Sequence, residues 1–579
     1  MPQWRERGRH DQAGPIRRDR FLLHFRFTVR NTSPCPNSAM IIDVAVIALY
    51  FAVIVGIGLW AGRSNQSLSE FSLGGRSIPW WAVLASIIAA ETSAATFLGT
   101  PAEGFKTRSF SYAQLAIGTV IARVIIAWLF IAPYYRHQVQ SIYEYLELRF
   151  GPCTRNTASA IFLITRVLGI GVRLYLGGVI LVVIWRYLYP GVEVTLGTYF
   201  WGILFVTVLT TFYTAVGGIK AVVWTDFIQA CLMLGAVTFA IYALVREVPG
   251  GFGGFMDVVS TSPGAGMFQT GWDAGKPFGQ AFGEMLESPY TLFAAIVGST
   301  FFTMATHGTD QDMVQRMLTA ENTAKSRLSL IASGLADIPI VLAFLAVGIL
   351  LWMYYDAHPD PSLPAATNEV FAHYIVHEMP IGIRGLIIAG VFATMMGSTS
   401  AALNALATSF VRDFYQPYLS RKNASDQSAV TAARVATVFF GGAMVGVATV
   451  SAYAVLRTNI TIIPLALGIL GYSYGSLLGV FLLGVLTKYR GNDRVNVVAM
   501  MLGIVSVLVF CRIEIPAIDL VQLLSGRVIP SQWSFGWFLP AWWPAIAWPY
   551  YVLIGTVATF GVAALFPSSQ PMESKSNLS

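Results

Sequence analysis

Long apolar runs, each about the length needed to cross a lipid bilayer, recur from residue 41 to residue 567. A membrane-spanning helix needs about 20 consecutive apolar residues. That window predicts about thirteen spans, which cover residues 41–62, 80–105, 110–133, 157–189, 197–215, 221–246, 289–318, 328–355, 381–411, 430–455, 460–487, 495–512 and 546–567. The Gly-rich stretch 247–288 is predicted to be an external loop. The pattern therefore predicts an all-α membrane protein.

Composition agrees with this fold class. The 579 residues are 55% hydrophobic and only 12% charged, whereas a soluble chain carries about 25% charged residues. The sequence contains no P-loop, nucleotide fingerprint, H-E-x-x-H or serine nucleophile elbow, so neither an ATP-driven pump nor an enzyme is expected. The four cysteines show no C-x-x-C spacing, so no disulfide framework or metal centre is expected.

Positive charge predicts the orientation, because Lys and Arg accumulate in cytoplasmic loops. Lys and Arg recur on one side of the predicted spans, whereas the opposite loop 356–380 has four acidic residues and no Lys or Arg. We expect an inner-membrane protein whose first span starts outside and whose short tail, 568–579, is cytoplasmic. Outside the N-terminal tail no basic face remains, so no nucleic-acid partner is expected.

The N-terminal tail, residues 1–39, disagrees with that orientation. It has eight Arg against three acidic residues, yet the pattern places it outside. Either translation starts at Met40, which opens the first span, or the tail is a disordered basic segment.

The span at 80–105 is unusual in its small and polar residues, SIIAAETSAATFLGTPAEGF for residues 86–105. Such residues permit either close helix packing or local unwinding, which exposes backbone carbonyls to a cation. Glu91 favours the second interpretation, because an intramembrane carboxylate is a functional candidate by default.

Two other segments carry polar groups that suit an alkali cation. Gly397, Ser398, Thr399 and Ser400 form a hydroxyl-rich patch within an apolar span, which could equally serve interhelical hydrogen bonds. Asp226 follows the turn GGIKAVVWTDFIQ (217–229), where a helix cap or an ion pair with Lys220 is the alternative role.

Further charged groups lie inside the predicted spans. Arg166 and Arg173 are seven residues apart and therefore share one helix face. Glu91 or a substrate carboxylate could neutralise them, whereas snorkelling to the interface is the simpler interpretation for Arg166. Arg123 is a similar case. His307 and Asp310 stand where Gly308 interrupts the span 289–318, which occupies the same position in a second repeat as 80–105 in the first.

Four motifs are similar to one known family. FSLGGRSIPWW (71–81), SIYEYLELRFG (141–151), GGIKAVVWTDFIQ (217–229) and QRMLTAENTAKSR (315–327) resemble the sodium:solute symporter family. The resemblance implies one domain, 40–567, with a LeuT-like core of two inverted five-helix repeats. It also implies sodium-coupled alternating access, with Na⁺, a small solute and the bilayer as partners and no other cofactor or metal.

The same resemblance implies the site residues. The main sodium site would use Ala89, Thr92, Thr394, Gly397 and Ser398, and a second sodium or coupling site would use Asp226 and Ser400. Substrate contacts would come from Glu91, Thr96, Arg173, Thr303 and His307. Family members often have hydroxyls where Gly397 and Ala401 stand, which weakens both sodium sites here.

The substrate class stays open at this stage. Ile121 and Leu467 stand where the sugar-transporting branch has polar residues, whereas TFLGTPAEGF and Arg173 favour a small organic anion of the monocarboxylate type. A sodium/sugar symporter, a proton-coupled carrier with Glu91 or Asp226 titrating, a channel and a sensor built on a symporter fold are the alternatives.

Overall fold

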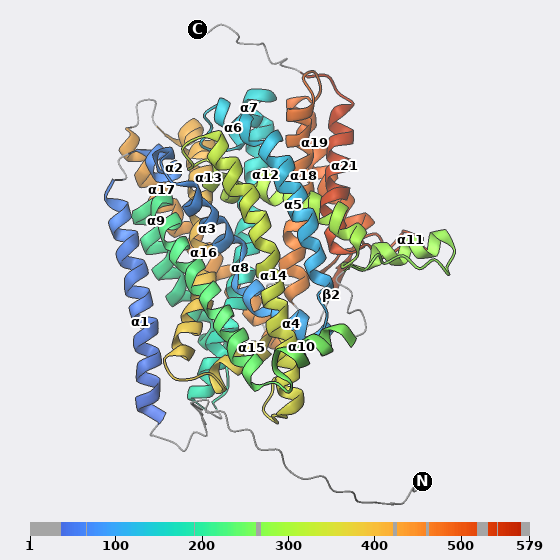
Figure 1. The fold of residues 1–579 in the computed structure, drawn as a ribbon. Helices are drawn as coiled ribbons and strands as arrows, with labels where there is room; N and C mark the ends of the chain where they lie inside the picture. The colour runs from blue at the N-terminus through green and yellow to red at the C-terminus, as the bar shows by residue number, and fades with distance from the viewer. Residues whose placement is uncertain are drawn as a thin grey trace, which may run out of the picture.

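The computed structural model describes residues 36–64, 67–189, 192–261, 268–420, 425–458, 462–517, 531–540 and 542–568. The predicted tails therefore lie almost wholly outside the described residues, as does the side chain of Leu467. Helices make up almost all of the described structure (Figure 1). The long helices are α1 (Pro36–Ala61), α8 (Pro152–Leu188), α9 (Leu196–Glu247), α14 (Thr323–Ala357), α16 (Ile383–Ser409), α17 (Asp426–Thr458), α18 (Ile462–Leu486) and α19 (Asp493–Phe510).

Shorter elements complete the bundle. They are η1 (Gly62–Ser64), α2 (Leu68–Leu73), η2 (Gly74–Arg76), α3 (Trp80–Glu91), α4 (Ala94–Thr107), η3 (Ser111–Gln114), α5 (Leu115–Leu129), α6 (Ile131–Arg136), α7 (Tyr143–Arg149), α10 (Gly251–Thr261), α11 (Phe278–Glu287), η4 (Ala294–Ser299), α12 (Thr300–Gly308), α13 (Gln311–Met317), α15 (Thr367–His377), η5 (Phe410–Leu419), η6 (Trp548–Tyr550) and α21 (Tyr551–Ala564). A two-stranded antiparallel hairpin pairs β1 (Glu514–Ala517) with β2 (Ser531–Ser534).

The predicted all-α membrane class is confirmed, apart from this hairpin. Within the described ranges, nine helices are long and apolar enough to cross a membrane, and the bent pair α3–α4 makes a tenth. Two predicted spans fall in α9, and the spans 289–318 and 546–567 correspond to shorter helices. The count of thirteen therefore stays a prediction.

Helix α9 reverses direction at Gly218. This residue has φ 58° and ψ −155°, a conformation that glycine adopts without the strain a side chain would cause. Tyr213 and Asp226 stand 13 residues apart in sequence yet interact electrostatically, which a straight helix with a rise of about 1.5 Å per residue would prevent. The predicted tight turn at 217–218 thus joins two antiparallel segments.

Burial separates the centre of the bundle from its edge. In the most apolar stretch of the span that contains α16, 94% of the residues are buried, whereas in that of α1 only 28% are buried. Accordingly, α1 stands at the edge of the bundle, where its exposed apolar side chains suit contact with lipid (Figure 1).

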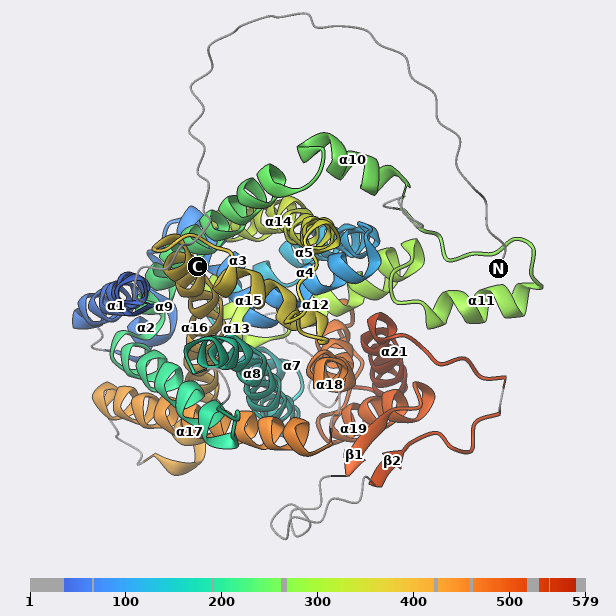
Figure 2. The same ribbon diagram turned by 90° about the horizontal axis from the view of Figure 1, so that it is seen from below.

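One short helix covers the middle of the bundle at the end where α1 begins. Seen from that end, α15 lies among α4, α12 and α14 (Figure 2). Phe371 of α15 stacks on Phe97 of α4 with 5.5 Å between ring centroids, and both rings are buried. These two rings form an aromatic layer between that end of the bundle and the break that separates α3 from α4.

Candidate functional site

The site begins at the break between α3 and α4, which are bent by 64° over two residues. Thr92 and Ser93 leave the helical conformation there, with ψ 86° and 170°. In a continuous helix the Ser93 N–H would donate to the Ala89 carbonyl, but it donates to the Glu91 carbonyl at 3.0 Å instead. The predicted unwinding is confirmed, and it frees the Ala89 oxygen for another partner.

Gly397 of α16 lies directly opposite that carbonyl. A β-carbon on Gly397 would stand 3.5 Å from the Ala89 oxygen, 3.4 Å from Asp226 Oδ1 and 2.8 Å from Gln229 Oε1. Asp226 Oδ1 and Gln229 Oε1 are both buried without a hydrogen bond. Three oxygens from α3 and α9 therefore converge where Gly397 has no side chain. Oxygen donors of this kind suit a hard monovalent cation.

The neighbouring hydroxyls on α16 donate to their own helix. Thr394 Oγ1 donates to the Val391 carbonyl at 2.8 Å, and Ser398 Oγ donates to the Thr394 carbonyl at 3.0 Å. Ser400 Oγ donates to the Gly397 carbonyl at 3.1 Å. Because their protons are used in this way, the lone pairs of these hydroxyls remain available to a cation. Thr92 is buried at the break itself.

A buried chain of ion pairs runs from this oxygen cluster through the bundle. Asp226 Oδ2 accepts from Ser86 at 2.6 Å and from Arg316 at 3.2 Å. Arg316 also pairs with Asp312, which pairs with Arg166. All the charged members are buried. The alternative of an Asp226–Lys220 pair is wrong, because Asp226 turns into the bundle toward Arg316.

The interpretation of Arg166 as a snorkelling side chain is also wrong. Arg166 is 4% exposed, and its guanidinium lies 3.3 Å from Asp310 in addition to its pair with Asp312. Tyr474 of α18 donates to Asp310 from the other side. The aspartates hold Arg166 inside the bundle because an unpaired charge there would be far more costly.

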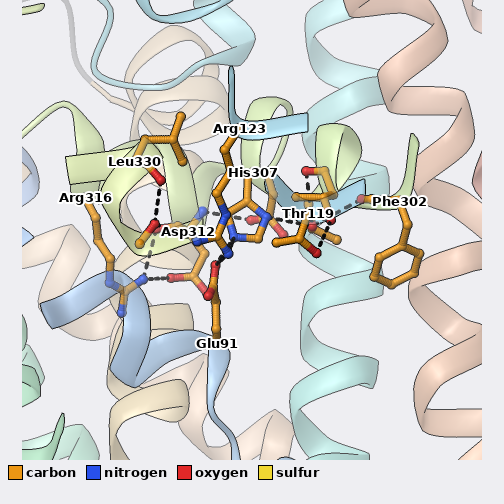
Figure 3. Close-up of polar contacts among 12 residues, drawn as sticks. Glu91, Thr119, Arg123, Phe302, His307, Asp312, Arg316 and Leu330 are labelled. Atoms are coloured by element: carbon orange, nitrogen blue, oxygen red, sulfur yellow. Dashed lines mark hydrogen bonds and ion pairs between the residues drawn. The ribbon is translucent and has the colours of Figure 1, made fainter. Parts of the chain in front are cut away.

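Glu91 belongs to a second cluster, on the other side of the broken helix (Figure 3). Its Oε1 contacts both Arg123 of α5 and Nε2 of His307 of α12. Arg123 also donates to Ser333 of α14 at 2.7 Å. Arg123, not Arg173, is therefore the partner of Glu91, and His307 is joined to the break itself.

Arg173 differs from the other arginines of this region. Among the described residues its side chain makes no hydrogen bond or ion pair, although it is partly buried in the middle of α8. Gly177, one turn further on the same face, faces Ala94 of α4 and Met395 of α16, since a β-carbon there would lie 3.3 Å from the Ala94 side chain. The helix turn that follows Arg173 thus packs against the start of α4.

The two remaining candidates line the same part of the bundle. Thr303 Oγ1 lies 3.4 Å from Oγ1 of Thr119, a residue of α5 that is labelled in Figure 3. Thr96 lies in the first turn of α4, where its N–H donates to Ser93, and its side chain is partly exposed. The structure thus brings Glu91, His307 and Thr303 together through α5 and places Thr96 in the first turn of α4, whereas Arg173 interacts electrostatically with Arg166 and the two aspartates Asp310 and Asp312.

Sequence reasoning missed three residues of this site. Arg316 and Gln229 stand within quoted motifs, and Gln229 is three residues after Asp226, on the same helix face. Asp337, which interacts electrostatically with Glu91 and Arg123, is a carboxylate in the apolar middle of α14, and a carboxylate inside a span was the available signal.

Comparison with known proteins places the chain in one family. The profile of the sodium:solute symporter family matches residues 71–503, so the protein belongs to that family. It is a multi-pass membrane transporter, not an enzyme, and sodium-coupled symport is the activity of its relatives.

The relatives are named for different solutes. The chain is 28% identical to the sodium/sialic acid symporter of Proteus mirabilis over 472 residues, covering 81% of this chain and 89% of the relative. It is 30% identical to the zebrafish (Danio rerio) sodium-coupled monocarboxylate transporter 2 over 460 residues, with 77% and 68% covered.

A solved structure supports the same fold. The structure of a Na⁺-coupled sialic acid symporter, described as substrate-bound, outward-open and containing a novel Na⁺ site, matches with a TM-score of 0.71 and 25% identity. The match covers 90% of this chain and 97% of the other. The expected LeuT-like, sodium-symporter architecture is confirmed.

Proposed function

We propose that this protein uses the sodium gradient to import a small carboxylate, and that Arg173 binds the carboxylate group. The observation that carries the proposal is the partly buried Arg173 guanidinium, which has no partner among the described residues. A charge within a spanning helix is costly unless it pairs or faces a cavity. A substrate carboxylate matches the fork of a guanidinium through two charge-assisted hydrogen bonds.

Charge balance supports an anionic substrate. Asp226, Asp310 and Asp312 carry three negative charges, and Arg166, Arg316 and Arg173 carry three positive charges. Arg173 feels both Arg166 and the two aspartates Asp310 and Asp312 electrostatically. Adding one sodium ion and one carboxylate together leaves this balance unchanged, whereas a neutral sugar would leave the sodium charge uncompensated.

Sodium would bind between the broken helix and α16. The proposed ligands are the Ala89 carbonyl, Thr92, Thr394 and Ser398, with Gln229 Oε1 occupying the space that a side chain at position 397 would fill. Asp226 and Ser400 border the same cluster and would supply the second sodium or coupling contact. The free oxygens of Ala89, Asp226 and Gln229 support this assignment.

The substrate would lie between Arg173 and the polar side chains near the break, where Thr96, Thr303, Glu91 and His307 would complete its surroundings. Sodium and substrate would both stabilise one conformation, which is the condition for coupling. The basic loops support an inner-membrane orientation with α15 on the outside, so that α15 would cover the outer entrance.

A transport screen of the wild-type protein tests this function. Purified protein in liposomes receives an inward sodium gradient and, in parallel, a labelled carboxylate, a sugar or a neutral amino acid. We expect uptake of acetate, lactate, pyruvate or N-acetylneuraminate that requires sodium. Sodium-dependent sugar uptake that excess carboxylate does not inhibit would contradict the proposal.

The coupling ion is tested in the same vesicles. A proton gradient without sodium should not drive uptake if sodium is the coupling ion. Uptake of equal rate with the proton gradient alone would instead assign coupling to the proton.

A further inference from the structure

A polar surface pocket of about 460 Å³ lies between two membrane spans, at the end of the bundle opposite α15, where α2 and α6 lie (Figure 1). Arg136 is the last residue of the span Ser111–Arg136, and Thr323 is the first residue of the span Thr323–Ala357. The pocket therefore stands where both spans reach the membrane surface. Its lining residues come from three segments that are far apart in sequence: Arg76, then Ala132, Tyr135, Arg136 and Gln138, and finally Glu321, Asn322 and Thr323.

Two arginines make this pocket positively charged. Arg136 is exposed and makes no hydrogen bond or ion pair with any described residue. Arg76 is partly buried, donates to a backbone carbonyl and lies over the Tyr135 ring, 5.2 Å from its centroid, so neither contact supplies a counter-charge. Glu321 is the only carboxylate among the described residues that line the pocket, and it pairs with Lys325. Both guanidiniums therefore lack an acidic partner in the described part of the chain.

Contacts between its segments hold the pocket in shape. The Ile78 N–H donates to the Thr319 carbonyl at 3.1 Å, and the Tyr135 hydroxyl donates to two backbone carbonyls of the segment that precedes α14. Arg76 and Gln138 have φ of 54° and 53°, a conformation that persists in residues with side chains only where the surrounding structure imposes it. The two guanidiniums thus start from a backbone that is already fixed.

A second basic and aromatic group lies one helix turn deeper on the same two helices. Trp128 precedes Ala132 by four residues, and Arg327 follows Thr323 by four. The Arg327 guanidinium lies over the Trp128 ring, 4.4 Å from its centroid. Trp128 is 66% exposed, as is typical of tryptophans at a membrane interface. Exposed apolar side chains continue along both helices, namely Ile121 and Val124 on α5 and Leu328 and Leu335 on α14.

We propose that this pocket binds the phosphate of an anionic phospholipid through Arg76 and Arg136, with the acyl chains along the exposed faces of α5 and α14. Guanidiniums bind phosphate oxygens through charge-assisted hydrogen bonds. The order of groups along the two helices matches the order of groups in a lipid: the two arginines for the headgroup, Arg327 on Trp128 for the interface, and apolar side chains for the chains. A free phosphate ester would use the arginines and leave the apolar faces without a role.

The position of the pocket supports the same ligand. Basic pockets between spans bind anionic headgroups on the cytoplasmic side of a membrane, and the proposed orientation, with α15 outside, places this pocket on that side. A bound lipid would join η2, the segment before the broken helix, to α6 and α14. The inference is independent of the transported solute, because neither Arg173 nor the proposed sodium ligands line this pocket.

The melting temperature of the purified full-length protein in detergent tests the proposal, with soluble dioctanoyl lipids as probes. Dioctanoylphosphatidylglycerol should raise the melting temperature along a saturating curve. Dioctanoylphosphatidylcholine, which has no net charge, and glycerol 3-phosphate, which has no chains, should each need about tenfold higher concentrations or more. Equal half-saturating concentrations for the two lipids would overturn recognition of an anion. Equal concentrations for phosphatidylglycerol and glycerol 3-phosphate would assign the pocket to a free phosphate ester and overturn the lipid assignment.

Variants locate the binding in the pocket. Arg76→Gln combined with Arg136→Gln should raise the half-saturating concentration of dioctanoylphosphatidylglycerol about thirtyfold. The charge-matched control combines Arg490→Gln with Arg494→Gln, two exposed arginines beside α7 at the same end of the bundle, and should bind the lipid as the wild type does. An equal loss in this control would show unspecific attraction and overturn the proposal.

Arg136→Gln alone carries the test if the double variant does not fold, because Arg136 has no partner among the described residues. It should raise the half-saturating lipid concentration about fivefold, and an unchanged value would contradict the proposal.

Trp128→Ala tests where the acyl chains lie. It keeps both pocket arginines, so the half-saturating concentration of dioctanoylphosphatidylglycerol should rise severalfold and that of glycerol 3-phosphate should stay constant. An unchanged value for the lipid, or an equal rise for both probes, would contradict the placement of the chains along α5 and α14.

Discussion

Arg166 and Arg173 lie seven residues apart on one face of α8, yet only Arg166 forms ion pairs with described residues. Two aspartates hold Arg166, whereas Arg173 has no partner among the described residues. The same residue type on the same helix is therefore held by ion pairs at one position and, in the function proposed here, would bind the substrate at the other. A charged residue within a membrane span indicates function only when its partners are known.

The two carboxylate oxygens of Asp226 differ in the same way, because only one of them has hydrogen-bond partners. Asp226 Oδ2 accepts hydrogen bonds from Ser86 and Arg316, whereas Oδ1 accepts none and faces Gly397. Asp226 thus connects the ion-pair chain with the proposed sodium site. Binding of a cation at Oδ1 would act directly on the group that Arg316 holds.

Removing Arg166 should have the largest effect on the folded protein. Arg166→Ala leaves Asp310 and Asp312 buried with one cation fewer, which we expect to destabilise the fold by about 3–5 kcal/mol. The yield and melting temperature of the purified protein measure this effect. Arg186→Ala is the control, because Arg186 is exposed and its pair with Glu369 contributes about 0–1 kcal/mol. Equal melting temperatures for the two variants would contradict the stabilising role of the buried ion pairs of Arg166.

Removing Arg173 should instead impair transport and spare the fold. Arg173→Gln loses charge-assisted hydrogen bonds to the substrate worth about 1.5–3 kcal/mol, which corresponds to a rise in KM of about ten- to a hundredfold. The melting temperature without substrate should be unchanged or higher, because no partner loses its charge. Uptake kinetics of the carboxylate found in the screen provide the measurement, and an unchanged KM would contradict the role of Arg173.

Filling the space at Gly397 should impair sodium binding beside Oδ1 of Asp226, the oxygen that accepts no hydrogen bond. Gly397→Ser introduces a β-carbon 2.8 Å from Gln229 Oε1, and overpacking of this kind costs about 1–3 kcal/mol. We expect a higher sodium concentration for half-maximal uptake. Combining it with Gln229→Ala should restore sodium affinity, because the new hydroxyl replaces the amide oxygen. Additive losses in the double variant would show that the two positions do not share one ligand position.

Ser398→Ala should have a smaller effect on the same parameter. It removes one neutral ligand of the proposed site, for which we expect about a fivefold rise in half-saturating sodium, equivalent to about 1 kcal/mol. Thr399→Ala is the neighbouring control, since Thr399 donates to the Met395 carbonyl and is not among the proposed ligands. A sodium dependence equal to that of the wild-type protein would exclude Ser398 as a ligand.

The smallest effect is expected at Asp360, a carboxylate outside the bilayer that forms hydrogen bonds with Ser362 and His373. Hydrogen bonds from Ser362, followed by His373, lower the pKa of Asp360 to about 2. A lowered pKa means that the contact is fully formed above about pH 4 and is lost only as the pH falls toward 2. Hydrogen exchange in α15 should therefore be constant from neutral pH to about pH 5 after correction for intrinsic rates. Asp360→Asn should raise that exchange slightly, and a marked loss of protection near pH 6 would contradict the prediction.

Local patterns predicted the parts of this site that depend on local backbone chemistry. The small residues around Glu91 predicted the break, and Gly217–Gly218 predicted the turn in α9. Partners that come from distant segments could not be predicted in this way. Lys220 was the nearest cation to Asp226 in sequence, whereas Arg316, 90 residues away, is its actual partner.

The roles of the two arginines show the same limit. Helix periodicity placed Arg166 and Arg173 on one face, but it could not indicate that Asp310 and Asp312, at the start of α13, form ion pairs with only one of them. Gln229 was overlooked because an amide in a helix has no distinctive pattern, and its importance follows only from the glycine opposite.

Ligand-induced stabilisation measures the central contrast most directly. The melting temperature of purified protein in saturating sodium is compared with and without an excess of the transported carboxylate, for the wild type and for Arg173→Gln. Ligand at about 100 times its Kd stabilises the folded state by about 2.7 kcal/mol, so we expect the wild-type melting temperature to rise and that of Arg173→Gln to stay constant. An equal rise in both proteins would show that Arg173 does not bind the substrate.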